Sequence, residues 1–236
     1  YQPPKPRSYR PKIGVIGAGG IVASHLEAYR AAGWDVVAIC NRTLAKAKAR
    51  AGDYFPKAWI TDHVADILSD TTIDVVDITP HPADRLPIIE AALKAGKHVL
   101  SQKPFVLDLN EGARLVELAE QKQLKLAVNQ NGRWAPYMSW MREAVNAGLI
   151  GDVLSCHASV HWDHSWITGT QFGKIEDLIL YDFAIHWFDF VASIAPGRAK
   201  TVFATANLAT DQTAQVPLMA QVLISLDGGQ ASLVFD

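Results

Sequence analysis

The sequence predicts an α/β fold in which a doubly wound parallel sheet is followed by a second domain of α+β type. Short apolar runs alternate with helical segments from Lys12 to about residue 129, as in a parallel sheet with crossover helices. Beyond residue 129, longer strand-like segments separated by turn residues are typical of an antiparallel sheet. We therefore expect an N-terminal arm at 1–11, a first domain at 12–129 and a second domain at 130–236.

The composition excludes several classes of protein. The chain has 236 residues, of which 49% are hydrophobic and 19% are charged, and its net charge of −2 does not favour nucleic-acid binding. Cys40 and Cys156 form neither a disulfide framework nor a CxxC pair, which fits a reducing compartment such as the cytoplasm. We see no apolar stretch long enough to cross a membrane and no signal-peptide core. Tyr1–Pro11 carries four prolines and is interpreted as an extended arm, lying on a partner subunit or disordered.

The first unit of the chain has the pattern strand, glycine loop, helix. Lys12–Ile16 is an apolar strand, His25–Ala32 is helical and ends at Gly33, and the glycine loop lies between them. Glycines at this point let the backbone turn tightly and approach a pyrophosphate on the helix N-terminus, although a glycine turn without a ligand is the alternative. Val22 replaces the usual third small residue, so helix and strand should pack slightly further apart. The predicted cofactor-binding residues of the loop are Gly17, Gly19, Gly20 and Ile21.

The remaining elements of the first domain continue the alternation. The predicted strands are Trp34–Cys40, Ala58–Ile60, Asp74–Ile78, Lys97–Leu100 and Leu124–Val128. The predicted helices are Thr43–Ala51, a helix capped by Asp62 and running through Leu68, Asp84–Ala95 with Pro87 in its first turn, and a helix capped by Asp108 and running through Lys122.

The second domain is expected to combine helices with an antiparallel meander. The predicted helices are Tyr137–Ala147 and Asp182–Ile194, and the predicted strands are Leu154–His161, Thr201–Leu208, Val216–Leu226 and Gln230–Phe235. The chain stops at Asp236 inside a strand-like run, so the predicted sheet can be incomplete.

Two groups of residues are candidates for catalysis. Lys103 follows a predicted strand and precedes Pro104; there it can hydrogen-bond a substrate hydroxyl, or it is an ordinary surface lysine. The Lys103–Pro104 bond can be cis. Asp182 and His186 are four residues apart in a predicted helix, so both project from one face. The carboxylate can raise the basicity of the imidazole for proton transfer, or the two form a structural contact.

The end of the second strand bears on the choice of cofactor. An acid at this position binds the ribose hydroxyls of NAD, but this chain has Asn41 and Arg42 there. We therefore expect NADP or NAD, with NADP favoured by the guanidinium. Arg42 can equally stack on adenine or face solvent.

The segment from Cys156 to Trp166 contains three histidines and two tryptophans. On a strand, His157, His161 and Asp163 would share one face, which permits a zinc site, but we predict no metal. We favour a polar wall of the substrate cleft, with Trp162 or Trp166 stacked on a ring of the substrate, over a solvent-facing sheet surface. The predicted substrate contacts in this segment are His161, Asp163, His164 and Trp166.

Several motifs in this order resemble the glucose–fructose oxidoreductase / inositol dehydrogenase / MocA-type (Gfo/Idh/MocA) oxidoreductases. The resemblance covers nearly all of the chain after the arm, and its motifs are Gly17–Ile21, Thr79-Pro80, Ala95–Pro104, Asn129–Trp134 and Asp182-xxx-His186. It implies an N-terminal Rossmann domain and a C-terminal domain on an open-faced, mostly antiparallel sheet. It also implies that Lys103 and His186 are catalytic, with Asp182 as partner of His186 or as substrate ligand, and that substrates are sugars, inositols and their derivatives.

The chain departs from the family pattern at the cofactor side. Gln102 stands where the family usually has Glu, and His81 and Asp84 stand where it often has Asn and His, which puts those contacts in doubt. Family members are usually longer. We include Thr79, Pro80, His81, Gln102, Lys103 and Asn131 among the predicted cofactor-binding residues.

The predicted function is NAD(P)-dependent hydride transfer to or from a secondary alcohol or ketone of a sugar, glycoside or cyclitol. One alternative is a redox-neutral NAD-dependent glycosidase, which oxidises a sugar transiently. Another is a non-enzymatic dinucleotide-binding sensor, against which the presence of both Lys103 and His186 counts. Because an open-faced sheet commonly needs a cover, we expect a homodimer or homotetramer and no nucleic-acid or membrane partner.

Overall fold

The computed structural model describes residues 6–195 and 197–236, which form two compact units. The first unit ends at Asn129 and the second begins at Gln130. Residues 6–11 contain neither helix nor strand. The first five residues of the predicted arm lie outside the described residues.

The first unit is built on a parallel sheet. Its strands are β1 (Lys12–Ile16), β2 (Asp35–Cys40), β3 (Trp59–Thr61), β4 (Val75–Ile78), β5 (His98–Gln102) and β6 (Leu126–Asn129). They pair in the order β3-β2-β1-β4-β5-β6, with β1 between β2 and β4. The chain reverses its direction of winding between β1 and β4, and in open α/β sheets ligands bind outside the carboxyl ends of the strands at such a point. The predicted doubly wound sheet is confirmed.

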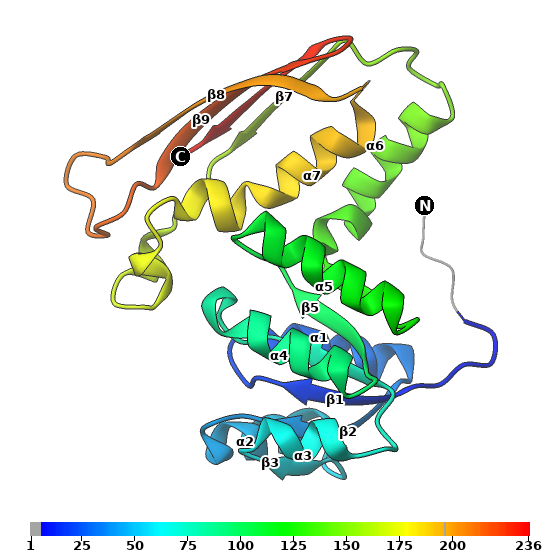
Figure 1. The fold of residues 1–236 in the computed structure, drawn as a ribbon. Helices are drawn as coiled ribbons and strands as arrows, with labels where there is room; N and C mark the ends of the chain where they lie inside the picture. Colours follow the sequence, from blue (N-terminus) through cyan, green and yellow to red (C-terminus); the bar gives the residue numbers. More distant parts are fainter. Residues whose placement is uncertain (1–5, 196) are drawn as a thin grey trace. The chain divides into compact units, whose positions relative to one another are not determined.

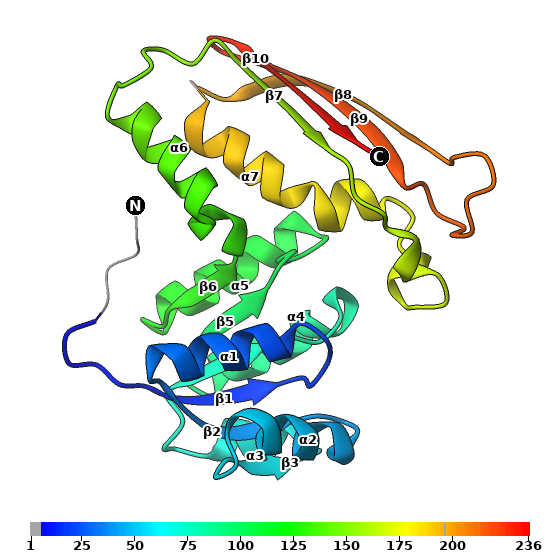
Figure 2. The ribbon, with the colours of Figure 1, turned by 180° about the vertical axis from the view of Figure 1, so that it is seen from behind.

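Helices cover both faces of this sheet. They are α1 (Val22–Ala32), α2 (Leu44–Tyr54), α3 (Val64–Ser69), α4 (Pro82–Lys94) and α5 (Leu109–Gln121). Apolar residues of α1 and α2 pack with one face of β1 and β2, and those of α3, α4 and α5 pack with the other face of the sheet. Helix α4 lies in front of the sheet in Figure 1, and α1 lies in front of it in Figure 2. Burial on both faces explains why the strands are apolar runs rather than alternating ones.

Two predictions for these helices were wrong. Asp62 does not cap α3, because His63 is the N-cap residue, and the Asp62 carboxylate lies 3.5 Å from the His63 imidazole. Helix α4 begins at Pro82 rather than Asp84, since proline has a backbone suited to the first helical position and the His81 ring accepts a hydrogen bond from the amide of Ala83. Pro87 therefore lies inside the helix rather than in its first turn.

The second unit is built on a mixed sheet with helices on one face. Its strands are β7 (Ser155–Val160), β8 (Ala199–Asn207), β9 (Met219–Leu226) and β10 (Gln230–Phe235), in the order β7-β10-β9-β8. Strands β8, β9 and β10 form the predicted antiparallel meander, and β7 pairs parallel to β10. The longer helices are α6 (Pro136–Asn146) and α7 (Ile185–Ile194), and α7 packs on the inner face of the sheet (Figure 1).

Irregular helical turns connect these elements. They are η1 (Asn131–Trp134), η2 (Ser165–Ile167), η3 (Phe172–Lys174) and η4 (Ile179–Phe183). The predicted helix from Asp182 is interrupted, because η4 is a π-helical turn in which the amide of Ala184 donates to the carbonyl of Ile179. Strand β7 ends at Val160, so the predicted shared strand face does not extend to His161 and Asp163. In the described part of the chain, no helix has the length and apolar character needed to cross a membrane.

Candidate functional site

The glycine loop between β1 and α1 leaves open space at its outer side. Gly17 has a φ of 107°, and a Cβ atom there would lie 2.3 Å from Thr79 Oγ1. For Gly19 and Gly20, no described atom beyond their chain neighbours comes within 4 Å of such a Cβ. The first glycine is therefore required by the fold, whereas the other two let a ligand approach the backbone closely. Ile21, which follows them, is exposed.

Asn41 links the end of β2 to this loop. Its side-chain oxygen accepts a hydrogen bond of 3.0 Å from the amide of Ala18, and its side-chain nitrogen donates to the carbonyl of Thr43. The amide of Gly17 donates to the carbonyl of Cys40 at 2.8 Å. The side chain that stands where ribose recognition was expected thus holds the loop in shape.

A cavity of about 310 Å³ lies beside Gly17 at the carboxyl ends of β1, β2 and β4. The predicted cofactor-binding residues that line it are Gly17, Asn41, Arg42, Pro80 and His81. Asp62 and Asp84 also line it, and neither was predicted to bind the cofactor. Burial and two carboxylates raise the pKa of the Cys40 thiol, which also borders the cavity, to about 11, so the thiol stays protonated at neutral pH.

Thr79 lies against Gly17 of the glycine loop. Its hydroxyl is buried and donates a hydrogen bond of 3.0 Å to the carbonyl of Ile16. The same oxygen is the atom that a side chain at Gly17 would meet. Its hydroxyl proton is therefore engaged with β1, and Thr79 shapes the glycine loop.

The backbone of Lys103 is held on both sides. The buried Gln102 side chain accepts a hydrogen bond of 2.7 Å from the Lys103 amide, and the buried Arg85 guanidinium donates to the Lys103 carbonyl at 3.1 Å. The Lys103–Pro104 bond is cis. The family usually has Glu at this position. Gln102 has a side chain of similar length and makes this hydrogen bond without a negative charge. The role of Arg85 was not predicted, and a buried arginine on an amphipathic helix gives no clear sequence signal.

In the second unit, the segment after Asn129 lies against α7. The side chain of Gln130 donates to the carbonyl of Ile185 at 2.9 Å. A Cβ atom on Gly132 would lie 3.0 Å from His186 Nδ1, so a side chain here would require the imidazole to shift by a few tenths of an ångström. Arg133 forms a bidentate ion pair with Asp189, with N–O distances from 2.8 to 3.0 Å. The structure thus brings the turn that contains Asn131 next to His186.

Asp182 lies in the π-helical turn η4 just before His186. Its side chain is buried, and His186 is half-buried at the start of α7. Single π-helical turns are uncommon and occur frequently at functional sites, because they change the direction in which side chains project. The prediction that both residues lie on one face of a regular helix therefore does not describe their setting.

Aromatic rings surround Phe183, the residue after Asp182. The rings of His164, Trp162 and Trp166 lie 4.0, 5.9 and 6.2 Å from the Phe183 ring, measured between centroids. His164 is buried, and this burial lowers the pKa of its imidazole. Two predicted substrate contacts, His164 and Trp166, therefore belong to one cluster that adjoins Asp182 in the chain.

The other two predicted substrate contacts have different surroundings. The Asp163 carboxylate accepts a hydrogen bond from the amide of Ser165, which holds the pKa of this carboxyl below its ordinary value. His161 pairs with Asp236 at the end of β7 and β10. Within residues 6–195 and 197–236, no three histidine, cysteine or acidic side chains are grouped as metal ligands.

A buried polar network in the first unit was also missed. The Asp77 carboxylate on β4 accepts hydrogen bonds from His25 Nδ1 at 2.7 Å and from the Tyr29 hydroxyl at 2.8 Å. The other ring nitrogen of His25 lies 2.9 Å from the side-chain nitrogen of Asn129. The network joins the helix after the glycine loop to the last residue of β6. Asp77 stands in the apolar run of β4, and this was the sequence signal from which the network could have been predicted, because a buried carboxylate needs hydrogen-bond partners.

The strand order and the glycine loop define the first unit as a dinucleotide-binding domain of the Rossmann type. Residues 11–130 match the model of an oxidoreductase family with an NAD-binding Rossmann fold, Gfo/Idh/MocA, and residues 138–235 match a C-terminal domain model of the same family. The chain belongs to the Gfo/Idh/MocA oxidoreductase family.

Individual relatives are similar at low identity. The chain is 27% identical to D-apiose dehydrogenase from Paraburkholderia graminis, over 94% of this chain and 59% of that protein. It is 29% identical to inositol 2-dehydrogenase from Corynebacterium glutamicum, over 81% of this chain and 56% of that protein. It therefore spans less than two thirds of the length of these relatives.

A solved structure shares the fold. Scyllo-inositol dehydrogenase from Lactobacillus casei, with bound NAD(H) and scyllo-inositol, matches with a TM-score of 0.84 and 21% identity, over 96% of this chain and 69% of that one. The match covers both units of the chain. It supports the fold class and not the substrate.

Proposed function

We propose that this protein is an NAD(P)-dependent dehydrogenase that acts on a secondary alcohol or ketone of a sugar, glycoside or cyclitol. The observation that carries the proposal is the open glycine loop beside a cavity at the carboxyl ends of the central strands. The names of the relatives supply the substrate class. The proposed roles are cofactor binding for residues 12–129 and substrate binding with oligomerisation for residues 130–236, in the cytoplasm.

The chemistry of the residues around the glycine loop suits a dinucleotide. The backbone at Gly17, Gly19, Gly20 and Ile21 would hold the pyrophosphate, because the first turn of α1, residues 22–25, carries no acid to repel it. Asn41, Arg42, Pro80 and His81 would border the adenosine, with Thr79 behind the loop. Gln102, Lys103 and Asn131 would border the nicotinamide, whose C4 carbon exchanges a hydride with the substrate.

Lys103 and His186 would hold the reacting hydroxyl group. Lys103 donates a hydrogen bond that favours alkoxide character of the substrate hydroxyl. His186, whose basicity the Asp182 carboxylate raises, takes or returns the hydroxyl proton. His164 and Trp166 would border the substrate, together with Asp163 and His161. Among these, Trp166 offers an exposed indole ring for stacking on a sugar.

The cofactor is proposed to be NADP or NAD, with a modest preference for NADP. Arg42 follows β2, and 89% of its side chain is exposed, so its guanidinium can reach a 2′-phosphate. Asn41 adds no negative charge at this position. The ratio of the dissociation constants for the two cofactors measures this preference directly.

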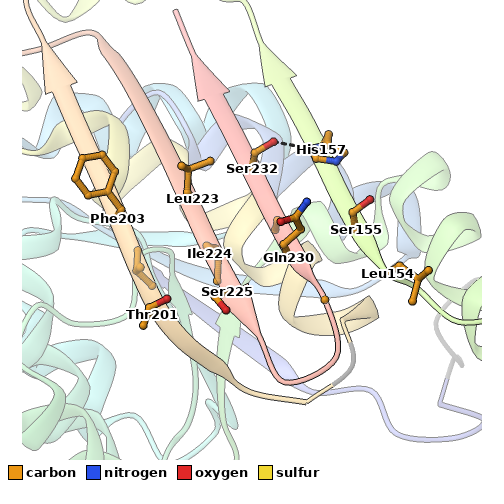
Figure 3. A pocket seen from close by; sticks show the side chains of 13 residues that line it. Leu154, Ser155, His157, Thr201, Phe203, Leu223, Ile224, Ser225, Gln230 and Ser232 are labelled. Carbon is orange, nitrogen blue, oxygen red and sulfur yellow. Dashed lines mark hydrogen bonds between the residues drawn. The ribbon is translucent and has the colours of Figure 1, made fainter.

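A homodimer or homotetramer is proposed because the outer face of the second sheet is apolar in part. Figure 3 shows Phe203 and Leu223 side by side on this face, and their exposed fractions are 65% and 57%. Ser232 and His157, whose side chains are hydrogen-bonded at 2.6 Å, lie on the neighbouring strands. A second copy would cover the apolar residues.

The test begins with titration of NAD⁺ and NADP⁺ into the protein. A panel of sugars, glycosides and inositols is then added, and the absorbance of the reduced cofactor is followed. Lys103→Ala and His186→Ala should each lower kcat by at least about 10³-fold while the cofactor still binds, and Lys57→Ala is the exposed control. Equal turnover in either variant would remove that residue from the proposal.

The same panel separates the alternatives. Release of an aglycone without net cofactor reduction would replace the dehydrogenase with a redox-neutral glycosidase. Tight cofactor binding without any turnover would favour a sensor.

A further inference from the structure

An ion pair crosses the edge of the cavity beside Gly17. Arg42, on the connection that follows β2, lies with its Nη2 atom 3.3 Å from Asp84 Oδ2. Asp84 belongs to the first turn of α4. Both residues line the cavity, although 42 positions of sequence separate them.

The charges around this cavity do not favour one cofactor by themselves. Arg42 supplies a positive charge, whereas Asp62 and Asp84 supply negative ones. Asp62 faces the imidazole of His63 at 3.5 Å, so Asp84 is the carboxylate in ion-pair contact with Arg42. The Arg42–Asp84 pair is largely exposed, and pairs of this kind are weak enough for a phosphate to compete with them.

We propose that Asp84 is a specificity-determining residue that limits the preference for NADP over NAD. The inference rests on the proposed function and extends it to a residue outside the glycine loop. The acid that recognises ribose hydroxyls ordinarily follows the second strand, where this chain has Asn41. Here α4 delivers a carboxylate to the same cavity, and that carboxylate holds the guanidinium that a 2′-phosphate would need.

Asp84 acts on the two cofactors in opposite directions. Against NADP it repels the phosphate and competes for Arg42, and both effects weaken binding. Toward NAD it can accept hydrogen bonds from the ribose hydroxyls, which strengthens binding. Removal of the carboxylate charge therefore changes the ratio of the affinities more than either affinity alone.

The experiment measures dissociation constants of NAD⁺ and NADP⁺ for the full chain and five variants, which include Arg42→Ala alone and combined with Asp84→Asn. Asp84→Asn should raise the preference for NADP⁺ over NAD⁺ by about fivefold to twentyfold. Asp84→Glu, which keeps the charge, should stay within about threefold of the parent ratio. In the Arg42→Ala background, Asp84→Asn should raise the preference by less than it does in the parent chain, because the competition for the guanidinium is then absent. Asp53→Asn removes an exposed acid of α2 as the matched control and should leave the ratio unchanged.

Salt gives a second readout that a structural effect would not produce. The gain in NADP⁺ preference should shrink as ionic strength rises from 20 mM to about 500 mM, because exposed charges are screened. A ratio that Asp84→Asn leaves unchanged, in a protein that binds both cofactors, overturns this inference and leaves the proposed function intact. Failure of the parent protein to bind either cofactor overturns both.

Discussion

The two sheets of this protein bury their residues in different ways. In the first sheet, Val15 and Val76 lie in central strands, and helices cover both faces. In the second sheet, strand β9 alternates, with Val222 and Ile224 inside and Leu223 outside. The first unit therefore completes its core by itself, whereas the second unit leaves an apolar surface exposed.

Polar groups follow the same division. Asp77 is buried in the first sheet and depends on His25 and Tyr29 for its hydrogen bonds. The His157–Ser232 pair of the second sheet is exposed. Substitutions in the first unit should therefore act mainly through stability and backbone shape, and those on the open sheet of the second unit through surface contacts.

The largest expected effect tests backbone shape in the first unit. Gly17→Ala places a Cβ atom 2.3 Å from Thr79 Oγ1 at a φ of 107°, so the loop has to move. We expect cofactor affinity to fall by at least about 100-fold, measured by titration calorimetry. Gly52→Ala, which meets no described atom within 4 Å, is the control. An affinity within threefold of the parent protein would show that loop shape is not critical.

The next effect tests the buried network. Asp77→Ala leaves His25 and Tyr29 without their acceptor, so the free energy of unfolding should fall by about 3 kcal/mol. Ser232→Ala in the second sheet should change it by less than about 0.5 kcal/mol. Urea denaturation, with hydrogen exchange to assign the loss to residues 12–129, measures both. Similar losses in the two variants would contradict this difference between the two sheets.

A smaller effect concerns the exposed face of the second sheet. Leu223→Arg should shift the molecule toward the monomer in sedimentation velocity, because a charge disrupts an apolar contact between copies. Val116→Arg, at an exposed apolar residue of α5 in the first unit, is the matched control. An unchanged sedimentation coefficient for Leu223→Arg would remove this face from the proposed interface.

The smallest effect concerns pH in the second unit. Burial lowers the pKa of His164 below its ordinary value of 6.5, although the nearby Asp163 and Asp182 carboxylates oppose this. Between pH 6.5 and the lower folded pKa, the unfolded chain binds a proton that the folded chain does not, so stability falls as pH falls. His164→Phe should flatten this slope and keep the ring against Phe183. A steeper slope in the variant would contradict the assignment.

Prediction from the sequence succeeded where local pattern decides structure. The glycine loop, the strand–helix alternation and the meander at β8–β10 were all predicted. It failed at two helix starts. The N-cap of α3 is His63 rather than the neighbouring Asp62. Helix α4 begins at Pro82, whose backbone suits the first helical position, so Pro87 lies inside the helix. The π-helical turn at Asp182 has no sequence signature, since its extra residue depends on packing.

The fold class and the position of the glycine loop follow from the amino-acid sequence, because both depend on local backbone freedom and on the spacing of apolar residues. Which distant side chains meet depends on tertiary packing. It paired Arg42 with Asp84, gave Asp77 its partners and gathered rings around Phe183. Such contacts depend on how strands and helices pack, and no periodicity along the chain specifies them.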